Sequence, residues 1–318
     1  MSRKAEKVGF GCLWFNETKH DPFVQLALAA AGTSKALVGS SIALAFTRSP
    51  TSIAYAAWDI QRLSKGRLVL GLGTQVKGHI ERRFGMKWES PARKMKEEVA
   101  AIRAIWKTWQ EGVPLDFTGR FFRLDLMTPF FSPGPIEHPR IPVYVAGVNA
   151  AMCRLAGAAC DGLHVHPLHT TKYLREVVVP ALKTGALESG RKRDDLSVTA
   201  SVFAAVGEDE REVAKMKEVM RGQVAFYAST RTYRRLMELH GWGGPAAKLH
   251  ELSSRGDWGL MAAEVTDEMM KEFAVEGSWK DMPSLLKSRY GGLVDRVRLY
   301  RPFDDSKGWR HLVDEFRP

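Results

Sequence analysis

Short apolar runs alternate with longer amphipathic segments along the whole chain. The runs have the length and the β-branched content of strands, and they lie at residues 9–15, 36–45, 67–72, 142–147, 161–166, 196–206 and 294–300. The segments between them repeat apolar residues every three or four positions, as in residues 91–109, which predicts helices with one buried face. The alternation predicts an α/β fold whose parallel strands are joined by crossover helices.

Two of the predicted helices have clear start signals. A serine precedes a proline at Ser49-Pro50 and again at Ser90-Pro91. A serine hydroxyl can cap the first turn of a helix, and a proline fits the first helical position because an N–H there would have no partner. We therefore expect helices to begin at Pro50 and Pro91.

The length of 318 residues fits one (β/α)8-type barrel. No repeat, low-complexity stretch or linker divides the sequence, so we expect a single domain over residues 1–318. The two longest gaps between predicted strands, residues 76–141 and 207–293, are too long for simple connections. We expect them to contain helices and insertions at the rim of the barrel.

Seven predicted strands are one fewer than such a barrel needs. Residues 2–10 look like the end of an amphipathic helix that runs into a strand, so the first strand of the barrel is the one apparently missing. A misassigned start, an open barrel or completion by another chain would each account for this pattern.

Composition narrows the range of partners. The chain carries 47 Lys and Arg against 36 Asp and Glu, a net charge of +11, and the basic residues are spread along the sequence. This distribution disfavours a nucleic-acid partner and favours an anionic small molecule. No apolar run is long enough to cross a membrane, and the first ten residues lack the apolar core of a secretory signal. The three cysteines form no CxxC pair, so we expect reduced thiols and a cytoplasmic location.

Active sites of α/β barrels lie where strands end and loops begin. Glu17 and His20 follow the first predicted strand and are candidates for contact with a cofactor or substrate. Arg48 follows the second strand and faces either the rim or solvent. Gly71 and Gly73 end the third strand, where missing side chains would let a planar ring approach the backbone.

The fourth and fifth predicted strands end in two further candidates. The strand before Gly147 breaks into a helix whose first N–H groups suit a phosphate, although a simple turn explains the same residues. His164 and His166 lie two apart and therefore on one face of the fifth strand. Two such imidazoles can start a zinc site, which introduces a metal-dependent barrel hydrolase as a competing class. Because the other strand ends offer few further ligands, we predict no metal site.

Several motifs then point to a family. Arg-x-Pro, Leu-Ser-x-Gly-Arg and Leu-Gly-Leu-Gly follow one another in RSPTSIAYAAWDIQRLSKGRLVLGLGTQVKGHIERRFG, and ETKHDPF, PVYVAGV and DGLHVHP accompany them. In this order and spacing they resemble the luciferase-like monooxygenase superfamily, and GTQVKGHIERRFG is similar to its branch of coenzyme F420-dependent oxidoreductases. The resemblance covers nearly the whole chain and weakens after Gly207. It implies a bacterial-luciferase-like TIM barrel, here as an N-terminally short member.

The resemblance also implies roles for particular residues. The family holds a non-prolyl cis peptide behind the cofactor ring, and the matching position here is Ser41-Ile42. Glu17, His20 and His166 would be the candidate catalytic residues. Contacts to the cofactor would come from Ser41, Ile42, Gly71, Gly73, Thr74, Gln75, Gly147, Val148 and Asn149. Arg82 and Arg83 would meet an anionic tail.

An F420-dependent member of this family would transfer a hydride between C5 of the deazaflavin and a small organic substrate. F420 carries a phosphate and a polyglutamate tail, so a net positive charge suits it. FMN-dependent monooxygenation is the alternative within the family. The alternatives outside it are the metal-dependent hydrolase and a cofactor-binding barrel without catalysis. A homodimer is one possible assembly.

Overall fold

The computed structural model describes residues 1–317, which form two compact units interleaved along the chain. Unit 1 comprises Met1–Ala146, Arg154–Leu163 and Thr184–Leu196, and unit 2 comprises Gly147–Cys153, His164–Lys183 and the residues from Ser197 onward. The chain passes between the units inside β7 (Val143–Gly147), α6 (Ala150–Ala159), β8 (Gly162–Val165) and α8 (Val179–Glu188). The single domain expected over residues 1–318 stays a prediction.

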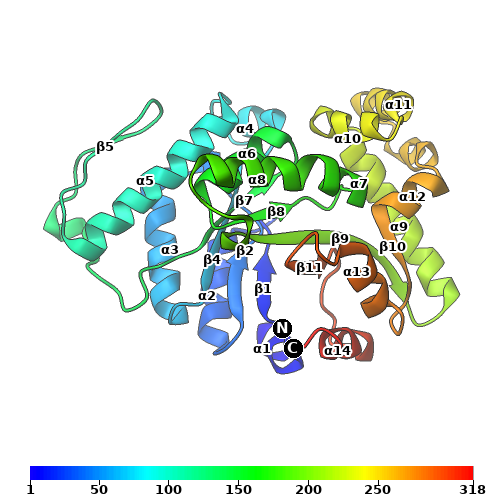
Figure 1. Cartoon of the computed structure of the whole chain (residues 1–318), viewed down its shortest axis with the longest axis horizontal. Helices are drawn as coiled ribbons and strands as arrows, with labels where there is room; N and C mark the ends of the chain where they lie inside the picture. The colour runs from blue at the N-terminus through cyan, green and yellow to red at the C-terminus, as the bar shows by residue number, and fades with distance from the viewer. Residues whose placement is uncertain (318) are drawn as a thin grey trace. The chain divides into compact units, whose positions relative to one another are not determined.

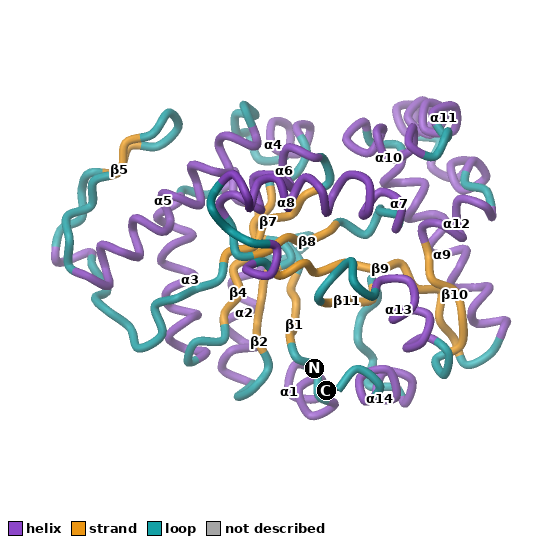
Figure 2. Tube along the Cα trace, in the orientation of Figure 1, coloured by secondary structure: helices purple, strands orange, loops and turns teal. Residues whose placement is uncertain are grey.

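Unit 1 is built on a parallel sheet. Its strands are β1 (Cys12–Phe15), β2 (Leu37–Ser40), β3 (Ala43–Leu44), β4 (Leu68–Gly73) and the first part of β7. They pair in the order β1-β2-β4-β7, with β3 beside the end of β4. Figure 2 shows β1, β2 and β4 running side by side. Because the strands are parallel, their carboxyl ends meet at one edge, which is where α/β sheets bind ligands.

Five helices belong wholly to unit 1: α1 (Ser2–Val8), α2 (Pro22–Gly32), α3 (Pro50–Ser64), α4 (Lys77–Arg82) and α5 (Pro91–Glu111). Both predicted starts are confirmed, since α3 begins at Pro50 and α5 at Pro91. The Ser49 hydroxyl accepts the N–H of Ser52 at 3.1 Å, as a capping serine should. Ser90 does not cap α5 with its side chain, and its backbone lies in the left-handed region with a φ of 39°.

A cluster of tryptophans joins α3 to α5, which lie next to each other in Figure 1. The Trp58 ring lies 6.4 Å from the Trp106 ring and 5.7 Å from the Trp109 ring, and all three side chains are buried. The Trp106 N–H donates to the Ala54 carbonyl at 3.2 Å. This is the buried face predicted for residues 91–109. Full burial of a large apolar side chain contributes about 2–3 kcal/mol, so the cluster is a major anchor of unit 1.

The first predicted rim insertion, residues 76–141, contains α4, α5 and a hairpin of β5 (Phe117–Thr118) and β6 (Arg123–Leu124). Glu97 on α5 holds the turn of this hairpin. Its Oε1 accepts the N–H groups of Phe121 and Phe122 at 2.6 and 2.8 Å, and its Oε2 accepts that of Arg120 at 3.0 Å. A single carboxylate thus fixes the hairpin to α5.

Unit 2 is organised around β9 (Ser197–Gly207). β11 (Arg296–Leu299) pairs in parallel with the first half of β9. β10 (Ala274–Ser278) pairs in parallel with the second half of β9. The helices wholly in unit 2 are α7 (Thr171–Tyr173), α9 (Glu210–Ala228), α10 (Arg234–Leu239), α11 (Gly243–Arg255), α12 (Asp267–Phe273), α13 (Met282–Tyr290) and α14 (Lys307–Asp314). Of these, α9 packs on β9 and β10. No described helix is both long enough and apolar enough to cross a membrane.

All seven predicted strands are present, and the second is interrupted at Ser41-Ile42 to give β2 and β3. β10 was not predicted, and it lies inside the second predicted rim insertion, residues 207–293. This strand has only two fully buried residues at its start and continues as Glu276-Gly277-Ser278, so it lacks the apolar pattern of a core strand. The opening residues form α1 and lead into β1, as their pattern predicted.

Glu98 is a carboxylic acid inside the apolar face of α5. Its side chain is 0% exposed, and neither carboxyl oxygen has a hydrogen-bond partner among the described residues. Burial raises the pKa of Glu98 to about 8; the charge of Lys94 opposes this rise and that of Glu97 adds to it. Protonation avoids the cost of burying an unpaired charge, so Glu98 is mostly neutral at pH 7.

We expect Glu98→Gln to change the pH dependence of stability. The folded pKa lies above the ordinary value of 4.5, so between about pH 4.5 and 8 the unfolded chain loses a proton that the folded chain keeps. Wild-type stability therefore falls as pH rises through this window, and the variant lacks this loss. The free energy of unfolding of the variant minus that of the wild type should rise by at most about 1.4 kcal/mol per pH unit. Urea unfolding across the window measures it, and parallel curves for both proteins would contradict the assignment.

Candidate functional site

The carboxyl ends of β1, β2 and β4 gather the predicted site residues of unit 1 at one edge. Phe15 at the end of β1 lies beside Ser40 at the end of β2, and Leu44 of β3 lies beside Gly73 at the end of β4. The loops that follow these strands carry Glu17, His20, Ser41, Ile42, Thr74 and Gln75.

Glu17 ties the segment after β2 to the end of β1. Its Oε2 accepts the Leu44 N–H at 2.7 Å and the Nη1 of Arg48 at 2.8 Å, and its Oε1 accepts the Nη2 of Arg48 at 2.9 Å. The Glu17 side chain is 8% exposed and that of Arg48 19%. A two-point pair of this kind fixes the planes of both groups. The Glu17 carboxylate is thus part of the scaffold of the site.

Arg48, which the sequence placed either at the rim or in solvent, extends this pair into a network. Its Nη2 also donates to Asp21 Oδ2 at 2.7 Å, and its Nη1 to the Leu44 carbonyl at 3.2 Å. Burial by itself would lower the pKa of Arg48, but the hydrogen bonds to Glu17 and Asp21 raise it above its ordinary value. Asp21 also caps α2 by accepting the Phe23 N–H at 2.8 Å. Arg48 therefore joins the loop after β1 to β3 and stays charged.

The Ser41-Ile42 peptide bond is cis, at the position that the family resemblance implied. The Ser41 N–H donates to the Phe15 carbonyl at 2.8 Å, and the Glu17 N–H donates to the Ile42 carbonyl at 3.2 Å. The side chain of Ile42 lies over Gly73, where a Cβ would come within 2.6 Å of Ile42 Cδ1. The space at Gly73 was predicted to admit a planar ring, but Ile42 fills that space, and this contact is why a glycine is needed.

The rest of the β4 end is neutral and polar. The Ser40 hydroxyl accepts the Gly71 N–H at 2.9 Å and donates to the Gly71 carbonyl at 2.8 Å, which locks β2 to β4. Beyond β4 the chain turns at Gln75, with a φ of 59°. The Thr74 hydroxyl donates to the Gln75 carbonyl at 2.9 Å, and Gln75 Oε1 accepts the Val76 N–H at 3.0 Å. Thr74 and Gln75 are half-buried, so part of this polar surface is accessible.

His20 and the two predicted tail-binding arginines are exposed in the same part of unit 1. Arg83 Nη2 donates to the Thr18 carbonyl at 3.0 Å, which ties the end of α4 to the loop after β1. Within residues 1–317, no hydrogen bond, ion pair or aromatic contact holds the His20 ring. His20 is therefore accessible at its edge of the site, in contrast to Glu17.

In unit 2, the predicted phosphate-binding residues Gly147, Val148 and Asn149 lie where β7 passes into α6. Asn149 Oδ1 accepts the Met152 N–H at 3.0 Å and so caps the helix. The Tyr173 hydroxyl donates to the Val148 carbonyl at 2.9 Å and fixes the peptide ahead of the cap. A capped helix start of this kind is a favourable place for an anion.

His166, also in unit 2, follows β8 and lies among tyrosines. The centroid of its ring is 4.6 Å from that of Tyr227 and 4.8 Å from that of Tyr233. The Tyr227 hydroxyl is 2.7 Å from the Tyr300 hydroxyl. These contacts place the imidazole in an aromatic, mostly apolar setting.

The protonation state of His166 follows from this setting. Burial, with His169 and Arg298 nearby, lowers the pKa of His166 to about 3. Its Nδ1 accepts the Leu168 N–H at 3.1 Å, so the neutral ring carries its hydrogen on Nε2. At pH 7 His166 can donate a hydrogen bond, but it holds no transferable second proton.

The residues that contact His166 and Glu17 were not predicted from the sequence. Tyr227, Tyr233 and Tyr300 come from α9, from residues 231–233 and from the end of β11, and no spacing links them to His166. One signal for Arg48 was available, because an acidic residue such as Glu17 at a buried strand end needs a partner of opposite charge. For the metal alternative, no group of three or more His, Cys, Asp or Glu side chains in the described part of the chain could hold an ion.

Comparisons with known proteins identify the family of the chain. Residues 1–296 match the model of the luciferase-like monooxygenase family. The chain belongs to this family. An uncharacterized protein of Mycobacterium tuberculosis is 46% identical over 292 residues, which cover 92% of this chain and 86% of the relative. The 5,10-methylenetetrahydromethanopterin reductase of Archaeoglobus fulgidus is 28% identical over 285 residues, which cover 87% of this chain and 81% of the reductase.

Solved structures of luciferase-like proteins share the fold. The coenzyme F420-dependent tetrahydromethanopterin reductase from Methanopyrus kandleri matches 99% of this chain and 92% of its own, with a TM-score of 0.79 and 22% identity. This likeness confirms the fold class, a mostly parallel α/β fold that matches luciferase-like TIM barrels. The resemblance found in the motifs is confirmed as well, and the luciferase-like chain is an oxidoreductase by class.

We expect Arg48→Met to lower the free energy of unfolding by about 3 kcal/mol, because it leaves the buried Glu17 carboxylate without its partner. Asp21→Asn is the matched control. It removes the exposed ion pair to Arg48 but keeps a side chain that caps α2, so it should cost less than about 1 kcal/mol. Denaturant unfolding compares the two, and equal losses would contradict the central place of the Glu17 pair.

We expect His166→Asn to make unfolding less sensitive to acid. The pKa of His166 in the folded chain, about 3, lies below its ordinary value of 6.5. Between about pH 3 and 6.5, His166 is therefore protonated in the unfolded chain but stays neutral in the folded chain. His166 therefore lowers stability progressively as pH falls below about 6.5. On acidification the variant should lose less stability than the wild type, by at most about 1.4 kcal/mol per pH unit. If thermal unfolding over this range shows the same slope for both, His166 is not held neutral.

Proposed function

We propose that the chain is an F420-dependent oxidoreductase that transfers a hydride between C5 of the deazaflavin and a small organic substrate. The observation that carries the proposal is the match, over 99% of this chain, to a reductase structure described as F420-dependent. The relative from Archaeoglobus fulgidus, also a reductase, supports the same reaction type. The same proposal includes a cytoplasmic location, a small-molecule substrate and assembly as a homodimer.

The predicted contact residues of each unit, taken by itself, suit a group of a planar, anionic cofactor. In unit 1, Ser41, Ile42 and Gln75 offer a neutral, half-buried surface of apolar and amide groups against which a flat ring can lie. In unit 2, the start of α6 with its Asn149 cap suits a phosphate. The exposed Arg82 and Arg83 suit an acidic tail, and the net charge of +11 favours its approach.

The contacts also support a different role for each of the three candidate catalytic residues. A bound deazaflavin would supply the hydride chemistry, and the protein its orientation. Glu17 positions the segment that carries Ser41 and Ile42, since both of its oxygens are engaged. His166 offers a neutral hydrogen-bond donor. Proton transfer is therefore assigned to the exposed His20.

FMN-dependent monooxygenation is the alternative within the family. Flavin enzymes are also among the structural neighbours, one of them with a modified FMN. The proposed ring and phosphate contacts would serve FMN as well. Arg82 and Arg83 favour F420, because FMN has no polyglutamate tail.

Two substitutions at Asn149 test the proposed phosphate position. Asn149→Ser keeps a cap and should bind F420 like the wild type. Asn149→Asp also keeps the cap, and a negative charge is favourable at a helix start. The free energy of unfolding of this variant should therefore equal that of the wild type. The same charge would repel the phosphate, and we expect about tenfold weaker F420 binding.

Fluorescence titration with F420 and with FMN, together with thermal unfolding, measures both effects. Equal affinity of the Ser and Asp variants would show that the phosphate lies elsewhere. If the wild-type protein quenches neither cofactor, the proposed function itself fails.

A further inference from the structure

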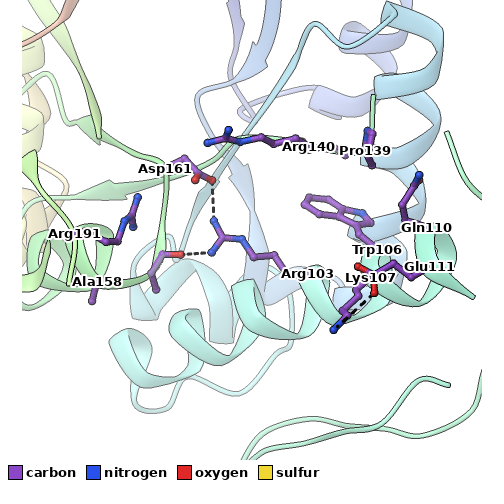
Figure 3. Close-up of a pocket in the computed structure, with 12 residues that line it drawn as sticks. Arg103, Trp106, Lys107, Gln110, Glu111, Pro139, Arg140, Ala158, Asp161 and Arg191 are labelled. Carbon is purple, nitrogen blue, oxygen red and sulfur yellow. Dashed lines mark hydrogen bonds and ion pairs between the residues drawn. The ribbon is translucent and has the colours of Figure 1, made fainter. Parts of the chain in front are cut away.

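A pocket of about 580 Å³ opens in unit 1, away from the strand ends that carry the candidate site (Figure 3). Ile141 and Asp161 in its wall lie just ahead of β7 and β8, so the pocket is at the amino ends of these strands. The other walls come from α5, from the end of α6 and from Arg191. None of the predicted cofactor-contacting residues lines it. The volume is in the range that small-molecule sites occupy.

Two arginines in the pocket are held in place by the protein. Arg103 Nη1 donates to the Ala159 carbonyl at 2.7 Å, and its Nη2 to Asp161 Oδ2 at 2.8 Å. Arg191 Nη1 donates to the carbonyls of Gly157 and Cys160 at 3.2 and 2.6 Å. A guanidinium has five N–H donors, so both groups are oriented by these bonds and still have donors for a ligand. Ordering them on binding would cost little further entropy.

The remaining charges of the pocket are only weakly compensated. Arg140 has no side-chain partner among the described residues, and Lys107 Nζ is 3.8 Å from Glu111 Oε2. The Asp161 oxygen that binds Arg103 also accepts the Val143 N–H at 2.8 Å, so this carboxylate is committed to the start of β7. Four cationic side chains therefore face two acidic ones, which makes the pocket electropositive.

An aromatic wall separates these cations. Figure 3 shows the Trp106 ring between Arg140 and Lys107, with Arg103 to one side. Trp106 directs its N–H to the Ala54 carbonyl, so its polar edge is already satisfied. Ile141 and Pro139 extend the apolar surface. Trp106 is 6% exposed and Ile141 5%, so only an edge of each side chain reaches the pocket. The edge of a ring that bears an anionic group can contact these apolar edges beside the cations.

We propose that this pocket binds a phosphate monoester on an aromatic ring system, of about the size of a nucleotide. Arg103, Arg140 and Arg191 contact the phosphate, and Lys107, on the other side of Trp106, adds attraction at longer range. The exposed edges of Trp106 and Ile141 contact the ring. Because the pocket lies at the amino ends of the strands, its ligand is an effector or a stabiliser and not the substrate. The inference is independent of the proposed F420 chemistry.

Calorimetric titration of the full chain with AMP tests this site. Adenosine lacks the anion and inorganic phosphate lacks the ring, so each should bind at least about tenfold more weakly than AMP. Arg140→Gln and Lys107→Gln should each weaken AMP binding by about threefold to fivefold. Arg93→Gln is the matched control, because Arg93 is also exposed and on α5 but does not line the pocket. It should leave the affinity for AMP unchanged.

The proposal would be overturned by no saturable AMP binding by the wild type, by equal binding of adenosine, or by the same loss of affinity in Arg93→Gln. Arg140 is exposed and unpartnered within the described residues, so its replacement should not impair folding. Thermal unfolding of each variant checks this. A normally folded Arg140→Gln and Lys107→Gln double variant that binds AMP like the wild type would also exclude the pocket.

Discussion

The two-point ion pair between Glu17 and Arg48 is the interaction on which the candidate site depends. Where β2 ends, the chain leaves the sheet and returns two residues later as β3, so its backbone groups lose their regular partners. Buried N–H and C=O groups must be satisfied. Glu17 accepts the Leu44 N–H, Arg48 donates to the Leu44 carbonyl, and the pair satisfies both side chains at the same time. The acidic residue at this strand end is explained by that need.

Burial decides which ionisable groups near the core remain charged. Arg48 keeps its charge because its hydrogen bonds to Glu17 and Asp21 offset the cost of its burial. Glu98 and His166 have no such partner and are neutral at pH 7, the first by keeping its proton and the second by losing it. In the proposed reaction, proton transfer would then fall to a solvated group. Among the three residues suggested by the family resemblance, only His20 meets that condition.

Local patterns in the sequence predicted most of the architecture but few of the contacts. Strands and helix starts follow from periodicity and from Ser-Pro pairs, which are read within a few residues. The position of the cis bond followed from family motifs. By contrast, the space at Gly73 is filled by Ile42, 31 residues earlier in the chain, and the surroundings of His166 come from segments more than 60 residues away. β10 was missed because its sequence has almost no apolar pattern.

The net charge of +11 suggested an anionic ligand, but the total says nothing about where one would bind. A cation attracts a ligand in proportion to the charge that its own neighbours leave uncompensated. At the carboxyl edge of unit 1, Arg48 is fully engaged by Glu17 and Asp21. Near the amino ends of β7 and β8, Arg140 and Lys107 are compensated weakly or not at all by the described residues. Weakly compensated cations therefore also lie at a place that the strand-end rule for active sites would not have selected.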